Sequence, residues 1–219
     1  MVAHETAREK AAAAPNRQPT GEFNLSHPLS SFIVVVTEVV LHPSRFFARL
    51  PRRESFLNPL LFALLCLGVS NILGGLAELV GMGGFGSLPL GIGIYQSFEA
   101  LIVSTIATAL AGTISLFIAA GILHELVCRM VGVPNSGYAA TFRVVSYATI
   151  IGLVSWIPVV GALLALVYGV FLFIVGIREV HDTTTEKAEQ VALVFPIAMF
   201  LMVALVCLLF LWVWILLFV

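Results

Sequence analysis

The chain has 219 residues, of which 60% are hydrophobic and only 11% are charged, and its formal net charge is −1. A soluble domain carries about 25% charged residues, so this composition excludes a soluble protein and indicates an integral membrane protein. The small net charge also gives no general attraction to nucleic acid. The three cysteines, Cys66, Cys128 and Cys207, form no CxxC pair and predict neither a metal site nor a redox motif.

Residues 1–24 are polar, rich in alanine and interrupted by two prolines. This composition predicts a disordered cytosolic N-terminus without the apolar core of a secretory signal peptide. The first long apolar stretch begins only near Leu57, so we expect it to serve as an uncleaved anchor.

Residues 25–56 form an intermediate, amphipathic zone. Its apolar run, Leu29–Leu41, has 13 residues and is interrupted by Glu38, whereas a membrane-spanning helix needs about 20 apolar residues. Pro43 is expected to divide the zone into two short helices. Polar side chains recur near one helical face, at Ser31, Glu38, His42, Arg45, Arg49 and Arg52.

Such helices are expected to lie in the membrane surface, with arginines toward lipid phosphates and apolar rings in the bilayer. The predicted membrane-surface residues are Arg45, Phe46, Phe47, Arg49, Arg52 and Arg53. The competing interpretation is that the arginines only set the topology and that the segment packs on protein.

Residues 57–219 are predicted to form a bundle of five transmembrane helices. The expected spans are about Leu57–Val80, Phe98–Leu123 with an interfacial end at Met130, two spans within Ala139–Ile177, and Val191–Val219. As one helix, Ala139–Ile177 would extend about 60 Å, twice the hydrocarbon core of a bilayer, so it must fold back. The bend is expected at 156–161, and a polar connection at 178–190 precedes the last span.

The basic residues predict the orientation of these spans. All 11 Lys and Arg residues precede the first span or flank the second and fourth connections, and the opposite side has none. The positive-inside rule therefore predicts a cytosolic N-terminus and an outer C-terminus, which requires an odd number of spans.

Few residues suggest chemistry. Glu78 and Glu99 lie on either side of the 81–97 loop. They could form a cation site, but we favour the interpretation that both carboxylates lie in the headgroup layer. His124 and His181, each followed by an acidic residue, allow a metal site. However, neighbouring helical side chains diverge and no HExxH motif is present, so we favour a cytosolic polar clasp joining 123–143 to 178–190. No catalytic residue, metal or cofactor is predicted.

Two stripes of small residues recur every four positions. They are Ala107, Ala111, Ser115 and Ala119 in the second span, and Gly161, Ala165 and Gly169 in the fourth. Such stripes allow helices to approach closely, and we favour packing within the bundle over self-association.

Several short motifs follow one another in a characteristic order. They are His42-Pro43-x-x-Phe46-Phe47, Tyr147-Ala148, Ile157-Pro158-x-x-Gly161 and Gly176-Ile177-x-Glu179-x-His181. In this order they resemble the Yip domain family of Ypt/Rab-interacting membrane proteins, over about residues 30–200. The resemblance implies five spans and a cytosolic N-terminus.

Eukaryotic members of that family act in vesicle traffic and associate with Rab GTPases. The N-terminal segment of this chain is short, and the sequence looks like that of a prokaryotic protein. We therefore expect the protein to lie in a bacterial or archaeal cell membrane. The expected function is a non-enzymatic membrane scaffold or organiser. Its expected partners are the bilayer, anionic lipids, and a membrane protein or a second copy, but not nucleic acid. The alternative is a small transporter or channel.

Overall fold

The computed structural model describes residues 22–51, 55–80, 97–132, 135–157 and 159–218, and every regular element in these ranges is a helix. The elements are α2 (Pro28–Leu41), α3 (Pro43–Ala48), α4 (Leu57–Leu79), α5 (Phe98–Met130), α6 (Tyr138–Ala148), η1 (Thr149–Ile151), α7 (Gly152–Ser155), α8 (Val160–His181) and α9 (Thr185–Phe218). The all-α class is confirmed.

Five helical stretches in the described residues are long and apolar enough to cross a membrane. The third of them is the continuous run Tyr138–Ser155, which joins α6, η1 and α7. The five predicted spans are therefore confirmed, and α2, with 14 residues, is a shorter apolar helix outside this set.

The link between the last two spans is shorter than predicted. α8 continues to His181 and α9 begins at Thr185, so only residues 182–184 connect them, rather than 178–190. Asp182 adopts a left-handed conformation with φ of 49°, which a short polar side chain tolerates and which ends α8 sharply. The polar residues flanking this link thus continue both helices.

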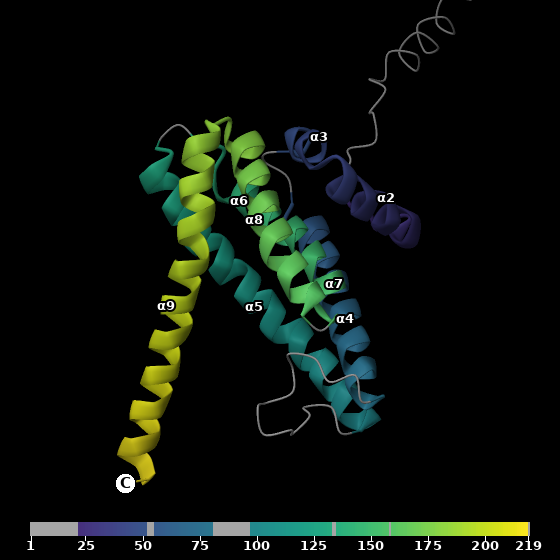
Figure 1. Cartoon of the computed structure of the whole chain (residues 1–219), viewed down its shortest axis with the longest axis vertical. Helices are drawn as coiled ribbons and strands as arrows, with labels where there is room; N and C mark the ends of the chain where they lie inside the picture. Colours follow the sequence, from purple (N-terminus) through teal and green to yellow (C-terminus); the bar gives the residue numbers. More distant parts are fainter. Residues whose placement is uncertain (1–21, 52–54, 81–96, 133–134, 158, 219) are drawn as a thin grey trace, which may run out of the picture.

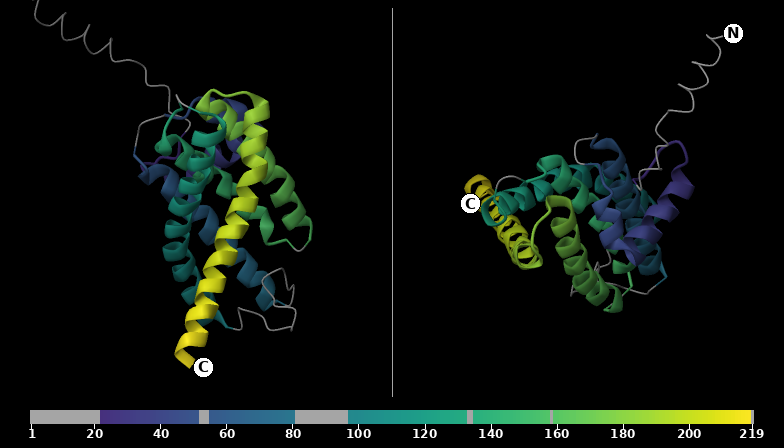
Figure 2. Two further views of the ribbon diagram at one scale, coloured as in Figure 1. Left: turned by 90° about the vertical axis from the view of Figure 1, so that its left-hand side faces the viewer. Right: turned by 90° about the horizontal axis from the view of Figure 1, so that it is seen from above.

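The helices form a bundle with distinct ends (Figure 1). α3, the residues just before α6 and the α8–α9 link gather at one end, which we call the head end, and the chain terminates at the opposite end. α2 and α3 lie on one flank of the bundle and α9 lies on the other (Figure 2). α4 packs along α5, and α9 packs against α5 and α8.

The most buried of the spanning helices is also the least apolar. In Tyr138–Ser155 the mean hydropathy is 1.3 and 56% of the residues are buried, whereas the other four spans have values of 2.1 or more and at most 33% buried. α6 packs against α4, α5 and α8, and every residue from Ala140 to Ala148 is buried. The bundle therefore surrounds its polar helix and keeps those side chains out of lipid.

The small-residue stripe on α5 does not pack within the bundle as predicted. Ala107, Ala111 and Ser115 are exposed, and only Ala119 is buried. The contact face of α5 lies to one side of the stripe and follows Leu101, Gly112, Leu116, Ala120 and Leu123. At Gly112 an added Cβ atom would lie 2.9 Å from Leu67 Cδ1 of α4, so this glycine is the close-approach point.

The stripe on α8 does lie against protein at its two glycines. A Cβ atom at Gly161 would collide with the Val154 carbonyl of α7, and one at Gly169 would lie 3.0 Å from Ile151 Cδ1. Ala165, between them, is half-buried. The close contacts at Gly161 and Gly169 allow α8 to fold back on α7 and η1.

Candidate functional site

The head end of the bundle contains a buried ion pair centred on α6. The guanidinium of Arg143 is fully buried, and its Nε donates to Glu22 Oε1 at 3.2 Å. Its other nitrogens donate to the carbonyl oxygens of Ala139 and Ser55, each at 3.1 Å. Glu22 has a side-chain exposure of only 3%. Because a buried charge needs a partner and further hydrogen bonds, this pair ties the N-terminal segment and the start of α4 to α6.

An aromatic cluster lies beside the ion pair. Phe23 is 1% exposed, and its backbone N–H donates to the Tyr147 hydroxyl at 3.4 Å. Phe62 of α4 lies between the two, with ring centroids 6.1 Å from Phe23 and 5.0 Å from Tyr147. Phe46 of α3 meets Tyr147 edge-on at 4.8 Å. Tyr147 therefore joins segments from four parts of the chain.

A second polar network runs through Thr141 of α6. Its Oγ1 lies 3.1 Å from His124 Nδ1 of α5 and 3.1 Å from His181 Nε2 at the end of α8. His181 Nδ1 accepts the Ser136 backbone N–H at 3.3 Å. His124 Nε2 lies 3.6 Å from Cys128 Sγ. The network thus bridges α5, α6 and α8.

The hydrogen-bond donors give this network a direction. A backbone N–H can only donate, so His181 Nδ1 is the acceptor and the proton of the neutral imidazole is on Nε2, which donates to Thr141. The Thr141 hydroxyl has one proton, and its two remaining partners are the Gly137 carbonyl at 3.4 Å, to which it can donate, and His124 Nδ1 at 3.1 Å.

The polar clasp predicted between 123–143 and 178–190 is confirmed. Besides the two histidines, Ser136 Oγ donates to the Val180 carbonyl at 2.6 Å, and Lys187 Nζ donates to the Val131 carbonyl at 3.1 Å. In the part of the chain that the structure describes, no three His, Cys, Asp or Glu side chains gather in a metal-binding arrangement. Glu125 is exposed and pairs with Arg129 instead.

The predicted membrane-surface residues divide into two groups. Phe46 and Phe47 are each 1% exposed, so the prediction that their rings enter the bilayer is wrong. They fill the space between α3, Tyr147 and α8, where Gly176 offers no side chain and leaves room for the Phe47 ring. Arg45 and Arg49 are exposed. Arg52 and Arg53 lie outside the described residues.

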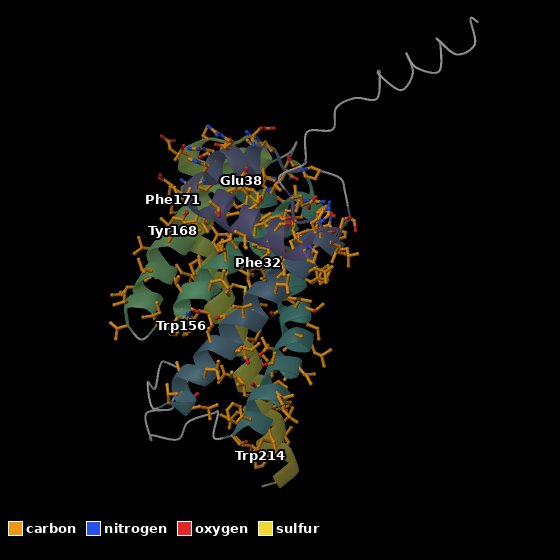
Figure 3. The ribbon with its side chains drawn as sticks, turned by 90° about the vertical axis from the view of Figure 1, so that its right-hand side faces the viewer. Phe32, Glu38, Trp156, Tyr168, Phe171 and Trp214 are labelled. Atoms are coloured by element: carbon orange, nitrogen blue, oxygen red, sulfur yellow. The ribbon has the colours of Figure 1, made fainter. Side chains whose placement is uncertain are left out.

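α2 is attached to the bundle on one side and is apolar on the other. Val35 and Val39 are buried, and the ring centroids of Phe32 and Phe62 are 5.4 Å apart. Figure 3 shows this side of the molecule, with Phe32 of α2 and Tyr168 of α8 labelled. The Tyr168 hydroxyl of α8 donates to the Val40 carbonyl at 2.7 Å and also approaches the Val39 carbonyl at 3.3 Å. On the outer side large apolar side chains are exposed, namely Leu29, Ile33, Val34, Val40 and Leu41.

The polar side chains in the middle of the first two spans bind each other. Asn71 of α4 donates from Nδ2 to Thr108 Oγ1 at 3.1 Å, and its Oδ1 accepts from Ser104 at 3.2 Å and Thr105 at 3.0 Å. These bonds fasten α4 to α5. Of the two acids at the far end, Glu99 is exposed in the first turn of α5 and Glu78 is half-buried near the end of α4.

Four of the motif residues lie in the contact between α3, α6 and α8. Phe47 packs near Gly176, Phe46 meets Tyr147, and a Cβ atom at Gly176 would lie 2.7 Å from Val144 of α6. Of the other motif residues, His42 is exposed, Pro43 begins α3, Gly161 lies at the α7–α8 bend, Glu179 accepts from Arg178 and His181 belongs to the clasp. Pro158 lies outside the described residues.

Sequence reasoning missed Glu22, Phe23, Ser136 and Thr141. The useful signal was Arg143, a charge five residues inside an apolar span, because a charge at that depth requires a partner. Its partner Glu22 lies in a polar segment that composition assigns to disorder. The sequence therefore indicates that Arg143 needs a carboxylate partner but does not indicate which residue supplies it.

The fold and this site define a class: a multi-pass, all-helical membrane protein whose N-terminal segment is built into one end of its bundle. A family model described as the Yip1 domain matches residues 37–208, which cover α3, the first four membrane helices and most of α9. The chain belongs to the Yip1 domain family. Comparisons with curated proteins and with solved structures returned no match.

Proposed function

We propose that the protein is a non-enzymatic membrane scaffold, which organises the bilayer by holding α2 in its cytosolic leaflet. The observation that carries the proposal is the two-sided character of α2. One side is attached to α4 and α8 through Phe32, Val39 and Tyr168, while the outer side exposes large apolar residues.

The length of α2 supports a position in one leaflet. Its 14 residues extend about 21 Å, less than the ~30 Å hydrocarbon core. A helix that occupies only one leaflet displaces lipid there and not in the opposite leaflet, and this asymmetry favours a curved bilayer. Arg45 and Arg49 follow the C-terminal end of α2 and are exposed. Anionic headgroups attract such cations by about 1 kcal/mol each.

The mid-span polar groups favour a scaffold over a transporter. A transporter places polar groups at the membrane midplane where substrate can reach them. Here Asn71 uses its amide to fasten α4 to α5 through Ser104, Thr105 and Thr108.

The test is reconstitution of the full chain into vesicles containing phosphatidylserine, with vesicle diameter measured by electron microscopy. We expect the wild-type protein to give smaller or tubular vesicles and the Leu29→Ser/Ile33→Ser variant to lose this effect. The matched control is Leu163→Ser/Leu166→Ser, which removes two exposed leucines from α8 and should remodel vesicles like the wild type. Equal remodelling by both variants, or gradient-driven ion flux that Asn71→Ala abolishes, would contradict the proposal.

A scaffold also requires something to organise, and we propose anionic lipid together with a membrane-protein partner or a second copy of this chain. Crosslinking in native membranes, followed by purification and identification of the attached proteins and lipids, tests this part. Recovery of uncharged lipids alone, with neither a protein partner nor a crosslinked dimer, would contradict it.

A further inference from the structure

The head end of the bundle holds Glu22–Phe23 in the way that a receptor holds a short peptide. On one side Arg143 is fully buried and is held in place by the Ala139 and Ser55 carbonyls, so that its Nε is directed at the Glu22 carboxylate. This site recognises a negative charge through a fixed, desolvated cation.

The neighbouring part of the site recognises an aromatic ring. Phe23 is 1% exposed, and its ring lies 6.1 Å from that of Phe62. The Tyr147 hydroxyl accepts the backbone N–H of the same residue at 3.4 Å. A buried charge beside a buried ring is the pattern of an energetic hot spot in a binding interface.

Within residues 22–27, Glu22 and Phe23 are the buried residues and make the contact with the bundle. Asn24, Leu25, Ser26 and His27, which lead from Phe23 to α2, are all exposed. One acidic and one aromatic side chain are therefore buried in the bundle, and the four residues that follow them lie on its surface. If it withdraws, Arg143 loses its charged partner while remaining inside the bundle, which strongly favours renewed occupation by a carboxylate.

We propose that the head end is a binding site for a short acidic–aromatic peptide element. The chain's own Glu22–Phe23 occupies the site, and the same element on a separate peptide exchanges with it. This inference does not depend on the scaffold function, because it concerns the contacts of Arg143, Phe62 and Tyr147 rather than the outer face of α2.

The test uses a fluorescent peptide covering residues 17–28 and the full chain in nanodiscs, with binding measured by fluorescence anisotropy. The Glu22→Gln/Phe23→Ala chain, whose own tail no longer fits the site, should bind this peptide saturably. A tethered tail competes at an effective concentration of about 1 mM, so the wild-type chain should bind the peptide at least about tenfold more weakly. A control peptide carrying Glu22→Gln and Phe23→Ala should not bind either chain.

A second measurement needs only the wild-type chain. The native peptide, added to about 1 mM, should accelerate amide hydrogen exchange in residues 22–27 by displacing them, and the control peptide should leave this exchange unchanged. The proposal is overturned if the native and control peptides act alike on the wild-type exchange. It is equally overturned if a Glu22→Gln/Phe23→Ala chain with a cooperative unfolding transition binds no native peptide.

Discussion

Arg143 is the residue on which most of the head end depends. Its guanidinium reaches the N-terminal segment, the start of α4 and its own helix, all without contact with solvent. A group of this kind contributes more to uniqueness than to net stability, because its desolvation offsets much of its attraction to Glu22. Removing only one partner is therefore the informative change.

We expect Arg143→Met to lower the free energy of unfolding by about 3 kcal/mol, since it leaves the Glu22 carboxylate buried without its cation. This is the lower end of the range for a broken buried pair, because the N-terminal segment can carry Glu22 out to water. Adding Glu22→Gln should recover part of the loss. Unfolding in mixed micelles, followed by circular dichroism, measures both variants.

The matched control is another Arg–Glu pair of the same chain. Arg129 Nε lies 2.7 Å from Glu125 Oε1, but the side chains are 74% and 60% exposed. Arg129→Met should change the unfolding free energy by no more than about 0.5 kcal/mol, because solvent screens the pair. Equal losses for the two substitutions would show that burial does not determine the contribution of Arg143.

Replacing Gly176 or Gly121 by alanine is predicted to change the free energy of unfolding in opposite directions. At Gly176 the new Cβ atom would lie 2.7 Å from Val144 Cγ1 and 3.4 Å from the Phe47 ring, and the β-branched valine cannot rotate away freely. Overpacking costs about 1–3 kcal/mol and exceeds the gain in helix propensity, so Gly176→Ala should destabilise. At Gly121 no atom lies within 4 Å, so alanine should stabilise by up to about 1 kcal/mol. The same unfolding measurement compares them, and a stabilised Gly176→Ala protein would contradict the close packing of α3, α6 and α8.

At the scale of the elements, α2 is joined to the spanning bundle by a small number of contacts. The Tyr168 hydroxyl supplies the polar part of this attachment by donating to carbonyls at the C-terminal end of α2. Apolar contacts are added by Phe32, Val35, Val36 and Val39. The position of α2 therefore depends on α8, which is far from it in the sequence.

Tyr168→Phe should loosen α2 without unfolding the bundle. The loss of one hydroxyl donor should cost about 1 kcal/mol and raise the rate of amide hydrogen exchange along α2. Tyr138→Phe is the control, because its hydroxyl donates at 2.9 Å to the Phe117 carbonyl of α5, away from α2. Hydrogen exchange in α2 that changes equally in both variants, or in neither, would argue against Tyr168 as the attachment point.

At the scale of the whole molecule, the number of spans is five, which is odd. The residues before the first span and those after the last span should therefore lie on opposite sides of the membrane. The connection before α6 and the α8–α9 link share the head end with α3 (Figure 1). The positive-inside rule predicts that this end faces the cytosol.

A reporter fused after Val219 should accordingly be active on the non-cytosolic side, and reporters inserted at Asn135 or Thr184 should be cytosolic. A protease-protection measurement on intact and permeabilised cells checks the same assignment without a fusion. Cytosolic activity of the C-terminal fusion would exclude the proposed orientation.

Much of the architecture could be predicted because its determinants are local. Each span needs an uninterrupted apolar run of sufficient length, and each can be counted along the chain. The fold-back between Ala139 and Ile177 followed from length alone. The clasp around His124 and His181 could also be predicted, because both histidines stand at span ends that the topology brings to one side.

The tertiary structure alone decided which face of each helix is covered. Phe46 and Phe47 lie in the core rather than in lipid, and the Ala107–Ser115 stripe faces outward. Inside a membrane, leucine or phenylalanine is equally suited to lipid and to protein, so hydrophobic periodicity does not distinguish the two surroundings. The Arg143–Glu22 pair was decided in the same way: composition shows that a buried arginine needs a carboxylate, but only the folded chain brings that carboxylate from a distant polar segment.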